Sequence, residues 1–324
     1  MNKSETRQGW FYIGKFAVSA FAILFCLVAL KFFTEHRLAP KNFGLGGVLS
    51  EPKLDLLLVG SSHTRKSYDM RLLEKGTGIT ASFQLGYDGT DLTMISQMLD
   101  YLVARPGHCP RYLVVEAYST MLARKPDLQD ARYFYDAPPS LKREIIRSYL
   151  ADRSYRSAFL DIFDLVVNRG NDEIVTHPFY SPIVERGSYK GGRTDLFFPG
   201  LSPEEFRKLE VKPQANVPDP AQLSALYRIL AVTRSHGIAV IFIDPPMPQP
   251  VSSGRDIQLL KKDFGEILSA QHIPYIDGDQ GFPINDPSMF SDSNHLSSKG
   301  REAFTSIVSV ELKSWMDSQP GSVR

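Results

Sequence analysis

The stretch LDLLLVGSSHTRKSYD, residues 54–69, ends an apolar run on a glycine and two adjacent serines. Residues 54–59 have the continuous apolar character of a strand that is buried on both faces of a parallel sheet. Gly60, Ser61 and Ser62 then form either a simple turn, in which glycine and serine are common, or a nucleophile presented at the carboxyl end of the sheet. The rest of the chain has to decide between these interpretations.

Downstream of this stretch, strand-like and helix-like segments alternate through residues 53–317. Further strands are predicted at residues 80–85, 111–116, 238–243 and 273–276. Helices are predicted at residues 67–75, 92–103, 220–236, 256–270 and 297–316. This alternation predicts an α/β fold, a three-layer flavodoxin-like parallel sheet with helices on both faces.

Residues of about 120–215 lack this rhythm. Residues 141–167 have helical spacing, whereas residues 170–200 are rich in Gly, Pro, Tyr and Arg. We expect this region to be a mostly helical and irregular insertion over the carboxyl edge of the sheet, where such folds bind ligands.

The N-terminal region is strongly apolar. Residues 10–33 read WFYIGKFAVSAFAILFCLVALKFF, and residues 16–30 carry no charge. A run of about 20 apolar residues can span a bilayer as a helix, and Lys3 and Arg7 favour a cytoplasmic N-terminus over residues 1–9. We therefore expect a transmembrane anchor at 10–33, a linker at 34–52 and a short tail at 318–324. A cleaved signal peptide and a buried helix are the alternatives.

Composition excludes some classes of partner. The net charge is +1, from 37 Lys and Arg against 36 Asp and Glu, so no nucleic-acid partner is expected. Cys26 and Cys109 form no zinc or redox pattern, and His177 and His236 have no metal-ligand spacing. The sequence therefore predicts no metal and no cofactor.

A second chemical motif, FSDSNHLSSKG, occupies residues 290–300 and leads into the last predicted helix. Asp292 and His295 are three residues apart, and a tight loop can bring both side chains to one side. A carboxylate in contact with an imidazole fixes its tautomer, and such an imidazole can take the proton of a serine. Ser62, Asp292 and His295 are therefore the candidate catalytic residues.

GSSHT at residues 60–64, followed far downstream by DSNHLSSKG, resembles the SGNH (GDSL-like) hydrolase superfamily in both motifs and chain order. The resemblance implies Ser62 as nucleophile, His295 as general base and Asp292 as its orienting partner. It also implies an oxyanion hole from the backbone N–H groups of Ser62 and Gly89, with Gly86 as the alternative glycine. Preorganised backbone donors of this kind stabilise the developing oxyanion.

One block departs from that family. An asparagine normally follows the third strand, but here the strand ends VVEAYST, residues 114–120. We expect Glu116 and Tyr118 to line the site instead. His63 either contacts the substrate or points away from it, and Arg193, with Arg186 and Lys190, either meets an anionic glycan or forms a solvated face.

In lacking this asparagine, the chain resembles membrane-anchored SGNH-like proteins of exopolysaccharide O-acetylation and teichoic acid D-alanylation. The segment VIFIDPPMPQP, residues 240–250, also resembles the strand and Pro-rich loop of such proteins. The resemblance implies a periplasmic or extracellular acyl-transfer enzyme, held at the cytoplasmic membrane by its N-terminal helix. Its implied partners are a cell-surface polysaccharide, an acyl donor and a multi-spanning membrane O-acyltransferase. An esterase that deacylates glycans or lipids, and a non-catalytic scaffold for that acyltransferase, are the alternatives. The acyl group, its donor, the glycan and the oligomeric state stay open.

Overall fold

The computed structural model describes residues 12–26, 29, 42–116, 118–126, 130, 133, 137–151, 189–193, 196–210 and 217–320. The predicted cytoplasmic segment 1–9, His177 and Arg186 lie outside these residues, as does most of the predicted insertion. Residues 12–26 are helical. Within the described part of the chain, no helix has both the length and the apolar character needed to cross a bilayer.

The core of the fold is one sheet of five parallel strands, in the order β2-β1-β3-β4-β5. The strands are β1 (Leu56–Gly60), β2 (Ser82–Gly86), β3 (Tyr112–Glu116), β4 (Ala239–Asp244) and β5 (Tyr275–Asp277). The prediction of an α/β fold with a parallel sheet is confirmed. In this order the chain reverses direction across the sheet between β1 and β3, and ligands of such sheets bind outside the carboxyl ends of the strands at that point.

Side chains of each strand alternate between two hydrophobic cores, because successive residues of a strand point to opposite faces. Leu57 and Val59 of β1 belong to the core that also contains side chains of α2, α5, α12 and α14. Leu56 and Leu58 belong to the core formed with α4 and α15. All five residues of β1 are buried, which explains the unbroken apolar run in the sequence.

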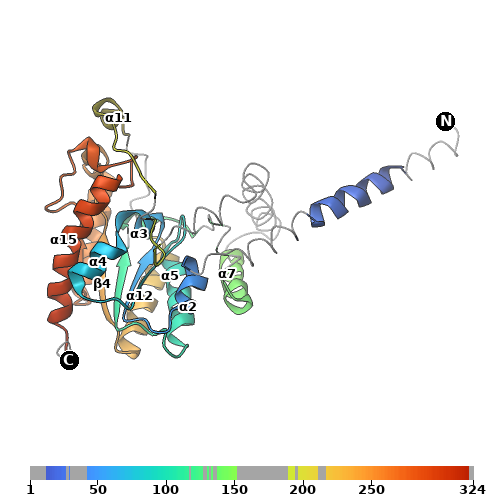
Figure 1. Ribbon diagram of the computed structural model, residues 1–324, viewed down its shortest axis with the longest axis horizontal. Helices are drawn as coiled ribbons and strands as arrows, with labels where there is room; N and C mark the ends of the chain where they lie inside the picture. The colour runs from blue at the N-terminus through green and yellow to red at the C-terminus, as the bar shows by residue number, and fades with distance from the viewer. Residues whose placement is uncertain are drawn as a thin grey trace.

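The helices lie on both faces of this sheet, with α4 and α15 on one side and α2, α5 and α12 on the other (Figure 1). The described helices after residue 42, on these faces and elsewhere, are α2 (Gly44–Ser50), α3 (Ser62–Ser67), α4 (Met70–Thr77), α5 (Leu92–Val103), α7 (Pro139–Ala151), α11 (Pro203–Arg207), α12 (Pro220–Ser235), α13 (Gln249–Ser252), α14 (Arg255–Ala270) and α15 (Ser298–Asp317). Two 3₁₀ turns, η1 (Ser119–Ala123) and η3 (Pro287–Met289), complete the described elements.

The second half of the expected linker 34–52 is part of the folded body. Residues 44–50 form α2, whose Leu45 and Val48 are fully buried. The backbone N–H of Leu45 donates to the hydroxyl of Tyr87 at 2.7 Å. The three glycines of FGLGG led to the prediction of a linker, but Leu45 and Val48, between and after these glycines, pack into the core beside the sheet.

Residues 189–193, the returning part of the predicted insertion, run along the outer side of β2. The backbone N–H of Gln84 donates to the carbonyl of Lys190 at 2.9 Å, and the N–H of Arg193 donates to the carbonyl of Arg65 at 3.1 Å. Lys190 also forms an ion pair with Glu74 of α4 at 2.5 Å. Residues 189–193 therefore lie beside both β2 and α3, at the carboxyl end of the sheet.

Candidate active site

Ser62 stands at the start of α3, directly after the carboxyl end of β1. Ser61 is the N-cap of this helix, and its Oγ accepts a hydrogen bond from the N–H of His63 at 3.3 Å. Gly60 ends the strand where space is very small, since a Cβ there would lie 2.1 Å from Oγ1 of Thr64 and 2.9 Å from Cβ of Glu116. The Gly-Ser-Ser sequence therefore permits a tight strand-to-helix turn that presents the second serine.

Asp292 and His295 lie on a tight loop that precedes α15. Oδ1 of Asp292 accepts from the N–H of Asn294 at 2.9 Å and from the N–H of His295 at 2.8 Å. A bridge between Phe290 and Leu296 closes the base of the loop. The Asp side chain thereby folds its own loop and stands beside the imidazole three residues later.

These two segments, 233 positions apart in the sequence, meet at the carboxyl edge of the sheet. Oγ of Ser62 lies 2.9 Å from Nε2 of His295, and Nδ1 of His295 lies 2.8 Å from Oδ2 of Asp292. The distances match those of a nucleophile, a base and an orienting carboxylate. The structure thus brings together all three residues that the sequence selected as catalytic candidates.

Asp292 is poised to stay ionised. Partial burial acts to raise the pKa of its carboxyl, but the hydrogen bond and charge of His295 and the N–H groups of Asn294 and His295 outweigh burial and hold the pKa at about 2. An ionised carboxylate accepts the proton on Nδ1 of His295. Nε2 is then left with the lone pair that can receive the proton of Ser62.

His63 is buried and forms the middle of a stack of three rings. Its ring centroid lies 4.6 Å from that of His295, with 24° between the planes, and 4.6 Å from that of Tyr118, with 22° between the planes. Burial, and then the neighbouring His295, lower the pKa of His63 well below its usual value. A neutral imidazole therefore packs against one face of the candidate base, a role that the sequence did not reveal.

Glu116 lies beneath the nucleophile turn. It ends β3, is almost completely buried, and its Oε1 accepts from Oγ of Ser61 at 3.5 Å. Burial raises the pKa of its carboxyl well above the usual value, and the nearby carboxylate of Asp244 adds to this rise. Glu116 thus contacts the residue before the candidate nucleophile, whereas Tyr118 reaches the site through its stacking on His63.

The two glycines considered for the oxyanion hole have different surroundings. Gly86 ends β2 beneath the turn, since a Cβ there would lie 2.6 Å from the carbonyl oxygen of Ser61. Gly89 has φ +70° in the loop that follows β2. The N–H of Ser62 lies in the first turn of α3, where backbone donors have no intrahelical acceptor. Ser62 and Gly89 stay the predicted oxyanion donors.

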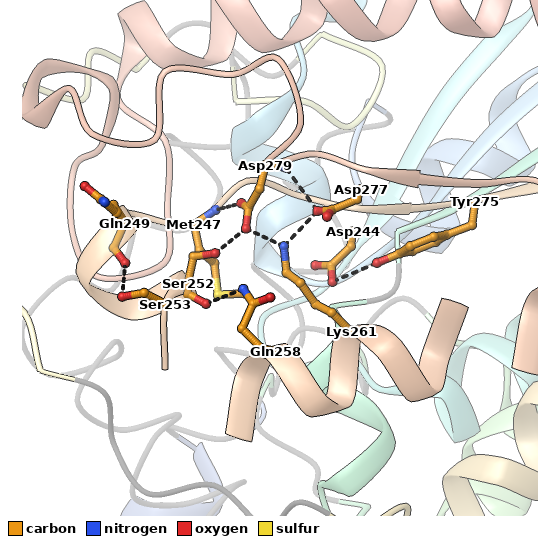
Figure 2. Close-up of polar contacts among 10 residues, drawn as sticks. All are labelled: Asp244, Met247, Gln249, Ser252, Ser253, Gln258, Lys261, Tyr275, Asp277 and Asp279. Carbon is orange, nitrogen blue, oxygen red and sulfur yellow. Dashed lines mark hydrogen bonds and ion pairs between the residues drawn. The ribbon is translucent and has the colours of Figure 1, made fainter. Parts of the chain in front are cut away.

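A separate polar network joins the carboxyl ends of β4 and β5 (Figure 2). Nζ of Lys261 contacts Oδ1 of Asp277 at 2.8 Å and Oδ2 of Asp279 at 2.5 Å, and the hydroxyl of Tyr275 donates to Asp244 at 3.3 Å. Burial raises the pKa of Asp244 to about 7 although Lys261 opposes this. The cavity of about 390 Å³ beside this network is lined by residues of α14, β5 and α15 and by Gln280, and by none of Ser62, Asp292 and His295. We interpret this network as structural, because its contacts hold the carboxyl ends of β4 and β5 together.

Metal-ligand residues do not gather in the described part of the chain: no three His, Cys, Asp or Glu side chains there are placed to hold an ion. His236, considered in the sequence, caps the exposed end of α12.

Comparison with known proteins supplies little for this chain. No protein-family model matches the sequence. No curated protein matches it. Among solved structures, the chain is similar to a proposed acylhydrolase from Bacteroides fragilis, with a TM-score of 0.39, 11% sequence identity, and coverage of 83% of this chain and 93% of that one. The functional assignment therefore depends on the geometry of the site.

Proposed function

We propose that this chain is a serine acyl-transfer enzyme that acts on O-acyl groups of a cell-surface polysaccharide. The observation that carries the proposal is the contact of Ser62 with His295 at 2.9 Å and of His295 with Asp292 at 2.8 Å. The position supports it as well, because the three residues meet outside the carboxyl end of β1, next to the point where the strand order reverses.

In the first half of the reaction, Oγ of Ser62 attacks the carbonyl carbon of the bound acyl donor while Nε2 of His295 takes the hydroxyl proton. The negative charge that develops on the carbonyl oxygen is stabilised by the backbone N–H groups of Ser62 and Gly89. The tetrahedral intermediate then collapses. His295 gives its proton to the departing alkoxide, which leaves as the alcohol, and the acyl group stays on Ser62 as an ester.

In the second half, the hydroxyl of a sugar enters the place of the departed alcohol. His295 takes its proton, the sugar oxygen attacks the acyl-enzyme, and the proton returns to Oγ of Ser62 as the new ester leaves. Water in the same place would yield a free acid instead, so the outcome depends on how well the acceptor excludes water. Asp292 stabilises the imidazolium at both steps.

Glu116 and Tyr118 occupy the place where the resembling family has an asparagine donor. Glu116 accepts a hydrogen bond from Ser61, and Tyr118 stacks on His63. We propose that the oxyanion hole is built from backbone donors alone, with these two residues supporting the turn and the base.

The proposed location is the outer face of the cytoplasmic membrane. The uncharged run at residues 16–30 supports it as a single-pass anchor, with the catalytic domain periplasmic or extracellular. A multi-spanning O-acyltransferase is the proposed partner that delivers the acyl group across the membrane.

The first test is hydrolysis of 4-nitrophenyl acetate by the full-length protein, with and without acceptor sugars. Ser62→Ala and His295→Ala should each lower kcat/KM by about 10³-fold or more, whereas Ser306→Ala, on the exposed side of α15, should leave it unchanged. Acetylated sugar formed at the expense of free acetate would identify a transferase, and free acetate alone would identify an esterase. If both variants sustain glycan acylation in cells, the chain is a scaffold and the proposal is wrong.

A further inference from the structure

Lys66 lies on the same side of α3 as the candidate nucleophile. It follows Ser62 by four residues, and residues at this spacing are neighbours on a helix surface, with Cβ atoms about 6 Å apart. Its ammonium lies 5.7 Å from the centre of the Phe198 ring, and Phe198 is held at the start of α15 by a hydrogen bond from its N–H to Oγ of Ser298 at 2.9 Å. Lys66 thus lies between the helix of the candidate nucleophile and the segment that follows His295.

Arg193 approaches the same place from the return segment of the insertion. Its N–H donates to the carbonyl of Arg65 in α3 at 3.1 Å, and its carbonyl accepts from Nη1 of Arg301 in α15 at 2.8 Å. Its backbone therefore bridges the helix of the nucleophile and the helix that follows the base. Burial lowers the pKa of Lys66, Asp88 and Asp292 act to raise it, and Arg193 and Arg65 lower it further, so the two cations and the carboxylate of the triad are electrostatic neighbours.

Among the residues that the structure describes, neither cation has a carboxylate within ion-pair distance, and Asp88 and Asp292 act on Lys66 only from farther away. Lys66 and Arg193 are both half-buried, and Nε of Arg193 is fully buried without a hydrogen-bond partner. Arg65, in contrast, stands 3.9 Å from Asp88 and stacks over Phe43. A desolvated cation without a close partner is costly, and the effect of Arg193 on the pKa of Lys66 shows that the two cations also repel each other.

We propose that Lys66 and Arg193 form a subsite for an anionic group, a carboxylate or a phosphate, carried by the substrate next to the ester that Ser62 attacks. The contact with Phe198 does not account for Lys66, because 5.7 Å is near the outer limit of a favourable cation–aromatic interaction. An arginine and a lysine together match such an anion well: the planar guanidinium offers two parallel donors and the ammonium adds a mobile one. The ligand class rests on the proposed acyl-transfer function, and the anion itself can belong to the acyl or the alcohol part.

Two matched ester pairs distinguish an anion on the acyl part of the substrate from an anion on its alcohol part. 4-Acetoxybenzoate and its methyl ester differ in charge on the alcohol part, and mono-4-nitrophenyl succinate and 4-nitrophenyl butyrate differ in charge on the acyl part. In Lys66→Gln and in Arg193→Gln, the ratio of kcat/KM for the charged ester to that for its neutral partner should fall about tenfold for one pair. Lys66→Arg should keep the ratio within about threefold. Lys262→Gln, which removes an exposed lysine of α14, should leave it unchanged.

A catalysis-independent measurement keeps the subsite separate from the proposed reaction. We expect full-length Ser62→Ala to bind one charged ester about tenfold more tightly than its neutral partner, in the ester pair whose kcat/KM ratio responds to the substitutions. Calorimetry measures both affinities, and the preference should weaken as the salt concentration is raised. Adding Lys66→Gln or Arg193→Gln should abolish the preference, while circular dichroism and the Tm report whether each variant is folded. If binding shows the preference and no ester is cleaved by the wild type, the proposed catalysis fails and the subsite stands. If folded Ser62→Ala binds charged and neutral esters equally well, both alone and combined with Lys66→Gln or Arg193→Gln, the proposed subsite is wrong.

Discussion

The imidazole of His63 stacks on that of His295, with ring centroids 4.6 Å apart and 24° between the planes. His63 directly follows Ser62, so the short helix α3 supplies both the hydroxyl that contacts His295 and the ring that stacks on His295. Tyr118 packs on the opposite face of His63 and keeps the stack in place. We therefore expect the orientation of His295, the proposed base, to depend on α3 as well as on Asp292.

Replacing His63 tests this support. His63→Ala should lower kcat/KM for 4-nitrophenyl acetate about tenfold, because loss of the stacked ring frees the imidazole of His295 to leave its productive orientation. His63→Phe, which keeps a flat ring, should recover activity to within about threefold. The pH–rate profile of His63→Phe should keep the shape of the wild-type profile, because the neutral His63 contributes no charge in the working range. Full activity in a folded His63→Ala would show that the stack is incidental.

Asp292→Asn should lower kcat by about 10³-fold or more while the protein stays folded. The carboxamide can still accept the N–H groups of Asn294 and His295, but its NH₂ can donate to Nδ1 of His295 and favour the tautomer that carries the proton on Nε2. That tautomer cannot accept the proton of Ser62. Asp317→Asn, which removes an exposed carboxylate of α15, is the control. A fall of less than tenfold would mean that Asp292 serves to fold the loop and not to orient the base.

Glu116 should make the stability of the fold depend on pH. Its folded-state pKa is raised, so between the unfolded value near 4.5 and that raised value the folded state binds a proton that the unfolded chain has lost. The free energy of unfolding should therefore fall as the pH rises above about 4.5. Glu116→Gln stays neutral and keeps an oxygen for Ser61, so it should gain stability relative to the wild type as the pH rises. Urea denaturation from pH 5 to 8 measures this difference, and a constant difference would contradict the prediction.

Gly60→Ala should disrupt the nucleophile turn. The new methyl group would lie 2.1 Å from Oγ1 of Thr64 and 3.0 Å from the carbonyl oxygen of Glu116, so the turn must shift. The expected cost is about 1–3 kcal/mol in the free energy of unfolding, with a larger relative loss of activity. Gly265→Ala is the matched control, because Gly265 lies inside α14 and a Cβ there would lie 3.7 Å from its nearest neighbour, the ring of Tyr275. Alanine there should stabilise the helix by up to about 1 kcal/mol. Equal melting temperatures for both variants would show that the turn tolerates a side chain.

Strands β1, β3 and β4 were predictable because they are buried along nearly their whole length and therefore read as apolar runs in the sequence. The segment 92–103 was predicted as a helix, and α5 has the same bounds. The meeting of Ser62 with His295 was expected because two short motifs resemble those of a known family and occur in the same order along the chain. The catalytic roles of these residues stay predictions.

Other features were out of reach for physical reasons. The stacking of His63 depends on how α3 is rotated about its axis, which the local sequence does not determine. The helix α2 was missed because glycines at residues 44, 46 and 47 outweighed the apolar pattern around Leu45 and Val48. The sequence offered Arg193 as a contact for an anionic glycan, but not its proximity to Lys66, because these residues are 127 positions apart and their backbone contacts leave no periodic pattern.

The pairing of residues 189–193 with β2 affects how the protein reaches its native state. One side of β2 pairs with β1, and the N–H of Gln84 on the other side is satisfied by Lys190, which the ribosome makes more than one hundred residues later. Until that segment arrives, β2 is an open sheet edge that could pair with another chain. Such high-contact-order closure is slow. A version truncated before residue 189 should therefore aggregate during synthesis, even though it contains the first three strands.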